Sequence, residues 1–367
     1  MMQRSIRSAA VLATLLAVAG GGAALGGDPS PYVMQKLSLP SSLLNYAEGI
    51  NNHGVAVGGV DPNSLLRDIG LSAAIYSNGQ VSGAGVLVGA TGSYDYAIND
   101  LGRSVGWAIK LLGVYPGPTL THAVLFAHDT AQDLGALPGG GNSEAYAINQ
   151  LDVAAGYSQV NALSFETHAT LFTFATHSVT DLGTLPGDIS SIAYGINDYG
   201  LVVGSSFDSN ENERAVRFLP GPVTALGTLP GDSISEARGV NDQGQAVGFS
   251  TRLRGSTHAV MFAGGQVVDL GVYPGGTYSV AAAINNFGQA VGSGDTGDGS
   301  FGHALLFQNG QVVDLGQLPG GNSSWATAIN DRGDIVGSAN DGNGTVWAVK
   351  WTLAHWAVGP LRPLPGR

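Results

Sequence analysis

Four histidines recur at the same place in a repeated phrase, and each is followed eleven or thirteen residues later by an aspartate. The pairs are His122 with Asp133, His168 with Asp181, His258 with Asp269, and His303 with Asp314. Imidazole is the commonest metal ligand in proteins. Because these histidines stand at equivalent places in separate repeats, they cannot converge on one ion. A structural His-Asp contact within each repeat is the better interpretation.

The two positions also change together. In the three remaining repeats, Ser72, Arg214 or Trp347 takes the place of His, and Gly83, Ala225 or Val358 takes the place of Asp. Pairing two strands across the Asn309-Gly310 turn puts Asp314 opposite Leu305, so that His303 becomes a diagonal neighbour on the same face. We therefore predict one His-Asp tether in each of the four repeats.

A second set of residues combines tyrosines with carboxylates on the first strand of the repeats. Its members are Tyr46, Glu48, Tyr94, Asp95, Tyr96, Glu144, Tyr146, Tyr194, Glu236, Arg238 and Trp325. They differ from repeat to repeat, whereas small residues recur beside them, and Asp95 stands where six repeats have Ala. Aromatic faces beside carboxylates suit a neutral ligand such as a glycan, or an extracellular protein anchored by Tyr and Trp. Filling gaps between repeats is the alternative role.

The carboxylates of this set raise an enzymatic alternative. Glu48, Asp95, Glu144 and Glu236 are candidates for the paired carboxylates of a carbohydrate-active enzyme. A sialidase-like site would need several arginines, and the set contains only Arg238. The sequence has no Gly-x-Ser-x-Gly elbow, His-Glu-x-x-His pair or phosphate-binding loop. We assign no catalytic residue and expect a binding protein rather than an enzyme.

Acidic loops form a third set, with Asp208, Asp295, Asp298 and Asp341 as candidate Ca²⁺ ligands. Ca²⁺ takes six to eight oxygen ligands. No loop carries a full spaced set with a closing Glu, so solvated loops are the alternative. We expect no other cofactor.

The elements that position these residues form a repeat of 44 to 50 residues. Seven asparagines anchor it: Asn51, Asn99, Asn149, Asn197, Asn241, Asn285 and Asn330. Each repeat reads as four short strands joined by turns that favour Gly, Asn and Asp. Seven four-stranded units predict an all-β, seven-bladed β-propeller of antiparallel blades, with a β-solenoid as the alternative. Ligands are expected on the face bearing the variable loops between the second and third strands.

Two terminal segments compete to complete the last blade. Residues 32–40 and residues 358–364 both resemble a degenerate fourth strand. Either would close the ring and remove its open edges. The sequence does not decide between them.

The repeated phrases resemble those of the bacterial extracellular HAF-repeat proteins. They are His-Ala-x-x-Phe, Asp-Leu-Gly-x-Leu-Pro-Gly-Gly and Ala-Ile-Asn-Asp-x-Gly-x-x-Val-Gly, and the resemblance covers residues 33–365. The phrase that names the family reads His-Ala-Val or His-Ala-Leu here. The resemblance implies an exported bacterial protein and no particular activity.

The N-terminal segment has the pattern of a secretory signal. Arg4 and Arg7 precede an apolar run at 9–19 and then small residues, which predicts a signal peptide at 1–24. A short linker at 25–31 and one propeller domain at 32–367 follow. No later run is long enough for a transmembrane helix. We expect a secreted, periplasmic or cell-surface protein.

Composition narrows the partners. The chain has 367 residues, a net charge of -12, three Lys and no Cys. A nucleic-acid partner is excluded because it requires a basic face. We expect a monomeric module that binds a glycan or an extracellular protein. A purely structural cell-surface protein remains an alternative.

Overall fold

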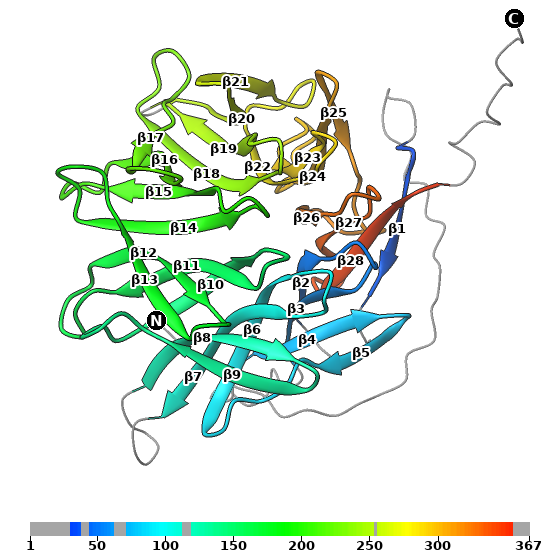
Figure 1. Cartoon of the computed structure of the whole chain (residues 1–367). Coiled ribbons are helices and arrows are strands. Elements are labelled where there is room, and N and C mark those ends of the chain that lie inside the picture. The colour runs from blue at the N-terminus through cyan, green and yellow to red at the C-terminus, as the bar shows by residue number, and fades with distance from the viewer. Residues whose placement is uncertain (1–29, 38–43, 62–70, 112–118, 253–254, 355–367) are drawn as a thin grey trace, which may run out of the picture.

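The computed structural model describes residues 30–37, 44–61, 71–111, 119–252 and 255–354. These residues form seven blades of four antiparallel strands around a central axis, which confirms the predicted seven-bladed β-propeller (Figure 1). The predicted signal peptide and residues 358–364 lie outside the described ranges. Within those ranges, no helix has the length and apolarity needed to cross a membrane.

The four strands of each blade are called A to D from the axis outward. Blades 1 and 2 contain β2 (Leu44–Ile50), β3 (Ala56–Asp61), β4 (Ser72–Ser77), β5 (Gln80–Gly83), β6 (Ala90–Ile98), β7 (Ser104–Leu111), β8 (Thr119–Ala127) and β9 (Thr130–Gly135). Blades 3 and 4 contain β10 (Ser143–Ile148), β11 (Val153–Gln159), β12 (Thr167–Thr173), β13 (Ser178–Gly183), β14 (Ser190–Ile196), β15 (Val202–Phe207), β16 (Glu213–Leu219) and β17 (Thr224–Ala225). Blades 5 and 6 contain β18 (Ile234–Val240), β19 (Ala246–Thr251), β20 (Thr257–Ala263), β21 (Gln266–Gly271), β22 (Ser279–Ile284), β23 (Ala290–Gly294), β24 (His303–Gln308) and β25 (Gln311–Asp314). Blade 7 contains β26 (Ser324–Ile329), β27 (Ile335–Asn340), β28 (Val346–Leu353) and β1 (Tyr32–Lys36).

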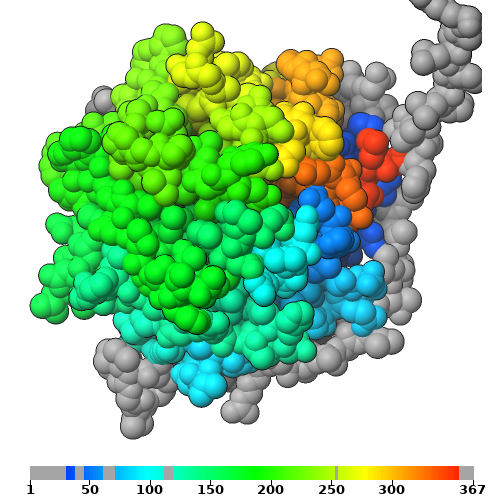
Figure 2. Space-filling model, viewed as in Figure 1, coloured from blue at the N-terminus to red at the C-terminus, as the bar shows by residue number. Residues whose placement is uncertain are grey.

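The ring closes through the N-terminal segment. β1 pairs antiparallel with β28, with Met34 opposite Trp351, and becomes strand D of blade 7. Figure 2 shows the blades following one another around the molecule until the blue first strand meets the red last strand. Of the two segments that competed in the sequence, the one beginning at Tyr32 therefore takes this place.

Glycine in the Val-Gly phrase allows strands A and B to approach closely. Strand A carries a β-bulge in every blade, next to this glycine. A Cβ on Gly106 would overlap the carbonyl oxygen of Tyr94. Only Gly fits such an approach, which explains why the phrase recurs.

The hydrophobic core lies between blades. Seven clusters of buried residues each draw on two neighbouring blades. The aromatic residue near the end of each strand C is at most 3% exposed in all seven: Tyr76, Phe126, Phe172, Phe218, Phe262, Phe307 and Trp351. The recurring Phe of the His-Ala-x-x-Phe phrase is thus the main core side chain of its blade.

A serine six residues before each anchoring asparagine joins consecutive blades. The Oγ of Ser191 accepts the backbone N-H of Ala169 at 2.8 Å and donates to the carbonyl of Gly183 at 2.6 Å. Six blades carry this serine, and blade 1 has Asn45, whose Nδ2 donates to the carbonyl of Val346. Blades 7 and 1 are therefore also joined by a side-chain hydrogen bond, which the longer Asn45 side chain makes.

Candidate functional site

The anchoring asparagines form a closed ring around the axis. Each Nδ2 donates to the backbone carbonyl of the asparagine in the next blade, and Asn330 returns the chain of bonds to Asn51. The Oδ1 of Asn197 accepts the N-H groups of Tyr199 and Leu201. Only an amide can donate and accept in this way, so the asparagine has a structural role.

A second ring lies one residue further along each A–B turn. The side-chain oxygen at this position accepts the backbone N-H of the equivalent residue in the preceding blade. The seven members are Asn52, Asp100, Gln150, Asp198, Asp242, Asn286 and Asp331. Together with six of the seven anchoring asparagines and the isoleucine or valine before each anchor, they line an axial cavity of about 220 Å³.

The tyrosines of strand A come together as one group across blades 1 to 4. Ring centroids lie 6.5 Å apart for Tyr46 and Tyr94, and 5.1 Å apart for Tyr94 and Tyr96. The series continues from Tyr96 to Tyr146 at 4.9 Å and from Tyr146 to Tyr194 at 5.6 Å. We call these five residues the tyrosine wall. Tyr94 is buried, and the other four retain partial exposure.

Strand B extends the tyrosine wall with two aromatic residues that lie outside the predicted set. Trp107 stacks on Tyr94 with centroids 6.0 Å apart and an interplanar angle of 10°, and Tyr157 lies 5.9 Å from Tyr146. Both belong to strands, β7 and β11. Alternation along strand B, which puts Trp107 and Tyr157 directly after the Val-Gly or Ala-Gly phrase, could have located them.

Two carboxyl groups are held within the tyrosine wall. Tyr94 donates to Oε1 of Glu48 at 2.6 Å, whereas Tyr146 and Tyr157 both lie 3.1 Å from Glu144 oxygens. Burial raises the pKa of Glu48 to about 7, although the Tyr94 hydrogen bond opposes this. Burial also raises the pKa of Glu144, against its tyrosine hydrogen bonds. Glu48 can therefore carry a proton near neutral pH.

A carboxyl pair lies beyond the end of the tyrosine wall. Glu213 of β16 is hydrogen-bonded to Glu236 of β18, and Arg238 forms an ion pair with Glu236. Burial and the contact with Glu236 raise the pKa of Glu213 to about 8. The guanidinium of Arg238 also lies 5.3 Å from the Phe249 ring. The pair can share one proton.

Two predicted members do not join this group. Asp95 is completely buried and cannot contact a ligand, which corrects its prediction as a ligand-binding residue. Its Oδ2 accepts a 2.5 Å hydrogen bond from Ser104, and burial raises its pKa well above the usual range despite that bond. Trp325 is partly buried on β26 in blade 7, and within the described chain its ring contacts no other aromatic ring.

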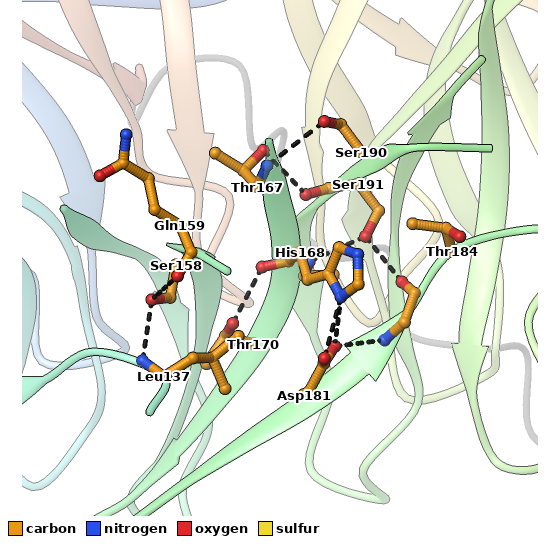
Figure 3. Close-up of polar contacts among 12 residues, drawn as sticks. Leu137, Ser158, Gln159, Thr167, His168, Thr170, Asp181, Thr184, Ser190 and Ser191 are labelled. Carbon is orange, nitrogen blue, oxygen red and sulfur yellow. Dashed lines mark hydrogen bonds and ion pairs between the residues drawn. The ribbon is translucent and has the colours of Figure 1, made fainter. Parts of the chain in front are cut away.

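The four predicted His-Asp pairs are in contact. Nδ1 of His122, His168, His258 and His303 lies 2.8 to 2.9 Å from the carboxylate of Asp133, Asp181, Asp269 and Asp314, respectively. Figure 3 shows His168 turned toward Asp181, which also accepts the N-H of Gly183. The aspartate thus bonds both to the imidazole and to the backbone of its own Asp-Leu-Gly corner, as expected of a structural tether.

Blade 7 replaces the His-Asp pair with another contact. Lys36 of β1 pairs with Val349 and so takes the place of the aspartate, a place that the sequence analysis gave to Val358. Its ammonium lies 3.5 Å from the centroid of the Trp347 ring, in a cation-π contact. In blade 4, Arg214 instead forms an ion pair with Asp188.

The candidate Ca²⁺ ligands are occupied by nearby donors. Asp208 accepts two N-H groups of its own loop, and Asp295 accepts those of Thr277 and Tyr278. Asp298 accepts the N-H of Ser300, and Asp341 accepts the indole of Trp347. In the described ranges, no three His, Asp or Glu residues are grouped to hold a metal ion. Calcium binding stays a prediction.

Solved structures share the fold at low sequence identity. The propeller domain of the Trilobed protease from Pyrococcus furiosus matches with a TM-score of 0.51 and 9% identity, over 88% of this chain and 99% of that one. A puromycin hydrolase matches with a TM-score of 0.54 and 13% identity, over 89% of this chain and 55% of that one. The acylaminoacyl peptidase of Pyrococcus horikoshii matches with a TM-score of 0.52 and 9% identity, over 85% of this chain and 52% of that one.

These likenesses support the propeller fold alone. The chain spans about half the length of the puromycin hydrolase and of the acylaminoacyl peptidase. No protein-family model matches the chain, and neither does any curated protein.

Proposed function

We propose that this protein is a binding module that holds a neutral glycan against its tyrosine wall. The observation that carries the proposal is the unbroken series of ring contacts from Tyr46 to Tyr194 across four blades. The wall lies on the innermost strands, so a rigid scaffold fixes it. Such a preordered surface lowers the entropy cost of binding.

The chemistry of the wall favours an uncharged polyol. Aromatic rings offer apolar faces, and their hydroxyl groups offer polar edges. Glu48, whose pKa burial raises to about 7, can donate a hydrogen bond to a sugar hydroxyl or accept one from it near neutral pH. Burial also raises the pKa of Glu144. Among the described residues, Arg238 is the one cation that forms an ion pair within the predicted site, and Glu236 already neutralises it. An anionic ligand is therefore disfavoured.

The enzymatic alternative is weaker. Glycoside hydrolysis uses two carboxyl groups about 5 to 9.5 Å apart. Glu213 and Glu236 are joined by a hydrogen bond, so their carboxyl groups lie closer together than that. Glu48 and Glu144 are each engaged by tyrosine hydroxyls in separate blades. We therefore favour binding over hydrolysis, and a protein ligand is the outcome to expect if no glycan binds.

Export remains part of the proposal. The predicted signal peptide and the HAF-repeat resemblance both support a location outside the cytoplasm, where glycans of cell surfaces are available.

A glycan array tests the proposal. Wild-type protein is expected to bind a set of neutral glycans, and Tyr96→Ala is expected to lose that binding because Tyr96 contacts two rings of the wall. Trp325→Ala, outside the ring series, is expected to retain it. Loss in Trp325→Ala with retention in Tyr96→Ala would move the site to blade 7. No binding to any glycan would overturn the glycan proposal.

A further inference from the structure

The face formed by the A–B turns carries exposed apolar groups that the tyrosine wall does not use. The residue two positions after each anchoring asparagine stands at the tip of its turn. Four of these seven residues are large and apolar: Leu101, Leu151, Tyr199 and Phe287, with exposed fractions of 56, 70, 81 and 74%. Three belong to the consecutive blades 2, 3 and 4. Grouped exposed apolar residues of this kind mark interaction sites.

These tips surround the axial cavity described above. The cavity of about 220 Å³ is several times the volume of a water molecule, which is about 30 Å³. Its lining includes Asp100, Asp198, Asp242 and Asp331, all partly exposed. Hydrogen bonds from the preceding blade fix one oxygen of each carboxylate. Asn52 or Asn286 also donates to the second oxygen of three of them, so the acidic ring is preformed.

The charge of this ring is not balanced from within. On the same face, Arg103 pairs with Asp152, while Arg332 and Lys350 pair with Asp334. In the part of the chain that the structure describes, none of the four axial aspartates has an ion pair. Burial and repulsion from the other three raise the pKa of Asp198. A cationic group at the axis would relieve that repulsion.

We propose that the A–B turn face docks a protein segment in which a Lys or Arg stands between apolar residues. The basic side chain enters the axial cavity and meets the aspartates, and the apolar neighbours cover Leu101, Leu151 and Tyr199. Charge complementarity selects the partner's central residue, whereas the apolar tips supply buried area. The surface is distinct from the tyrosine wall, so both sites can be occupied together.

A random heptapeptide library displayed on phage is the probe for this surface. Panning on the full chain is expected to enrich peptides with a Lys or Arg flanked by apolar residues. One enriched peptide is then synthesised and titrated by calorimetry. A twin peptide with Gln in place of the basic residue should bind at least tenfold more weakly.

Matched variants locate the site. Asp198→Asn with Asp242→Asn removes two charges and keeps the bonds from backbone N-H to side-chain oxygen, because Asn52 and Asn286 already serve there. It loses the bond from Asn286 Nδ2 to the second oxygen of Asp242. Leu151→Ser with Tyr199→Ser removes two apolar tips. Each pair is expected to weaken binding at least tenfold. Leu163→Ser with Phe165→Ser, exposed on the β11–β12 connection of the opposite face, is the control and should bind as wild type.

Three results would overturn the proposal. The first is that the enriched peptides lack a basic residue. The second is that the aspartate and apolar-tip double variants bind the peptide as well as wild type does. The third is that the A–B turn face binds lipid vesicles. The last is checked with phosphatidylcholine vesicles: wild-type binding that Leu151→Ser with Tyr199→Ser abolishes would assign the apolar tips to a membrane surface. Glycan binding by the same variants should be unchanged, which separates this site from the tyrosine wall.

Discussion

At the residue scale, one amide side chain links each blade to the next. Asn197 caps its own turn with Oδ1 and donates through Nδ2 to the carbonyl of Asn241 at 2.9 Å. Aspartate keeps the acceptor but loses the donor. The recurrence of Asn, and never Asp, at all seven anchors follows from this double role.

Asn197→Asp is therefore expected to destabilise the fold by about 1 to 3 kcal/mol, because a buried carboxylate oxygen without a donor would then face the Asn241 carbonyl, which keeps only its bond from the Gly244 N-H. Urea denaturation followed by circular dichroism measures the loss. Asp198→Asn, the next residue, retains its acceptor oxygen and serves as control with a small effect. Equal stability of Asn197→Asp and wild type would refute the asparagine ring as a source of stability.

The His303 imidazole gives a second prediction at this scale. Burial lowers its pKa, but the hydrogen bond and charge of Asp314, with Asp298, outweigh burial and raise it above 6.5. The stability that this pair contributes is present below pH 6.5 and is lost as pH rises through the raised pKa. In Asp314→Asn, an NMR titration should show the His303 pKa fall. An unchanged His303 pKa would show that Asp314 does not hold the ring.

At the element scale, the phrases of the sequence locate the strands because each is tied to a backbone requirement. Gly106 meets a carbonyl, and Phe172 fills the space between blades, so both recur and can be found. Asp95 could not be placed by the same logic, since its burial depends on Ser104, which stands where the other blades have Ala, Val or Ile. The paired change from two apolar residues to Asp95 and Ser104 was the available signal.

The closing strand could not be chosen from sequence for a similar reason. Lys36 has no likeness to the aspartate whose place it takes, because its partner in blade 7 is Trp347 rather than His. Because blade 7 has neither the His nor the Asp of the other blades, the sequence of β1 does not show that it is equivalent to their fourth strands. Likewise, Asp152 replaces the turn glycine at a φ of 59° and contacts Asn99 and Arg103 of the preceding blade. That contact joins two blades, so it cannot be predicted from the sequence of a single repeat.

An engineered disulfide tests the closure. Val33 and Thr352 are partners across β1 and β28, and the chain has no native Cys. Val33→Cys with Thr352→Cys is expected to cross-link under mild oxidation and to raise Tm by several degrees, because the bridge restricts the unfolded chain. The reduced form is the control. Failure to cross-link would indicate that β1 does not occupy the edge of blade 7.

At the scale of the whole molecule, carboxyl groups with raised pKa values couple stability to pH. The pKa values of Glu48 and Glu213 are raised from 4.5 to about 7 and about 8. The folded state therefore holds these protons more tightly than the unfolded state. Their contribution to stability is complete below about pH 4.5 and is lost as pH rises through about 8.

Glu213→Gln mimics the protonated carboxyl and is expected to reduce the fall in unfolding free energy between pH 5 and pH 9. Urea denaturation at both pH values measures it. Glu166→Gln, at an exposed carboxylate, should leave the fall unchanged. If Glu213→Gln has the same pH dependence as wild type, Glu213 is not protonated in the folded protein.

The tyrosine wall shows how the blades combine into a site that no single repeat contains. Variation between repeats marks its members in the sequence, but the contacts among Tyr94, Tyr96 and Tyr146 depend on how neighbouring blades pack. The sequence does not mark the axial aspartates as a site, because each belongs to a recurring turn phrase whose role is interpreted as structural. Only closure of the ring brings them around one cavity.

The most direct test of the binding account is the affinity of one neutral glycan selected on the array, measured by calorimetry with three proteins. Wild type and Tyr199→Ala, a tyrosine exposed on the opposite face, are expected to bind with the same Kd. Tyr96→Ala is expected to bind at least tenfold more weakly. Equal Kd for Tyr96→Ala and wild type would contradict a ligand site on the tyrosine wall.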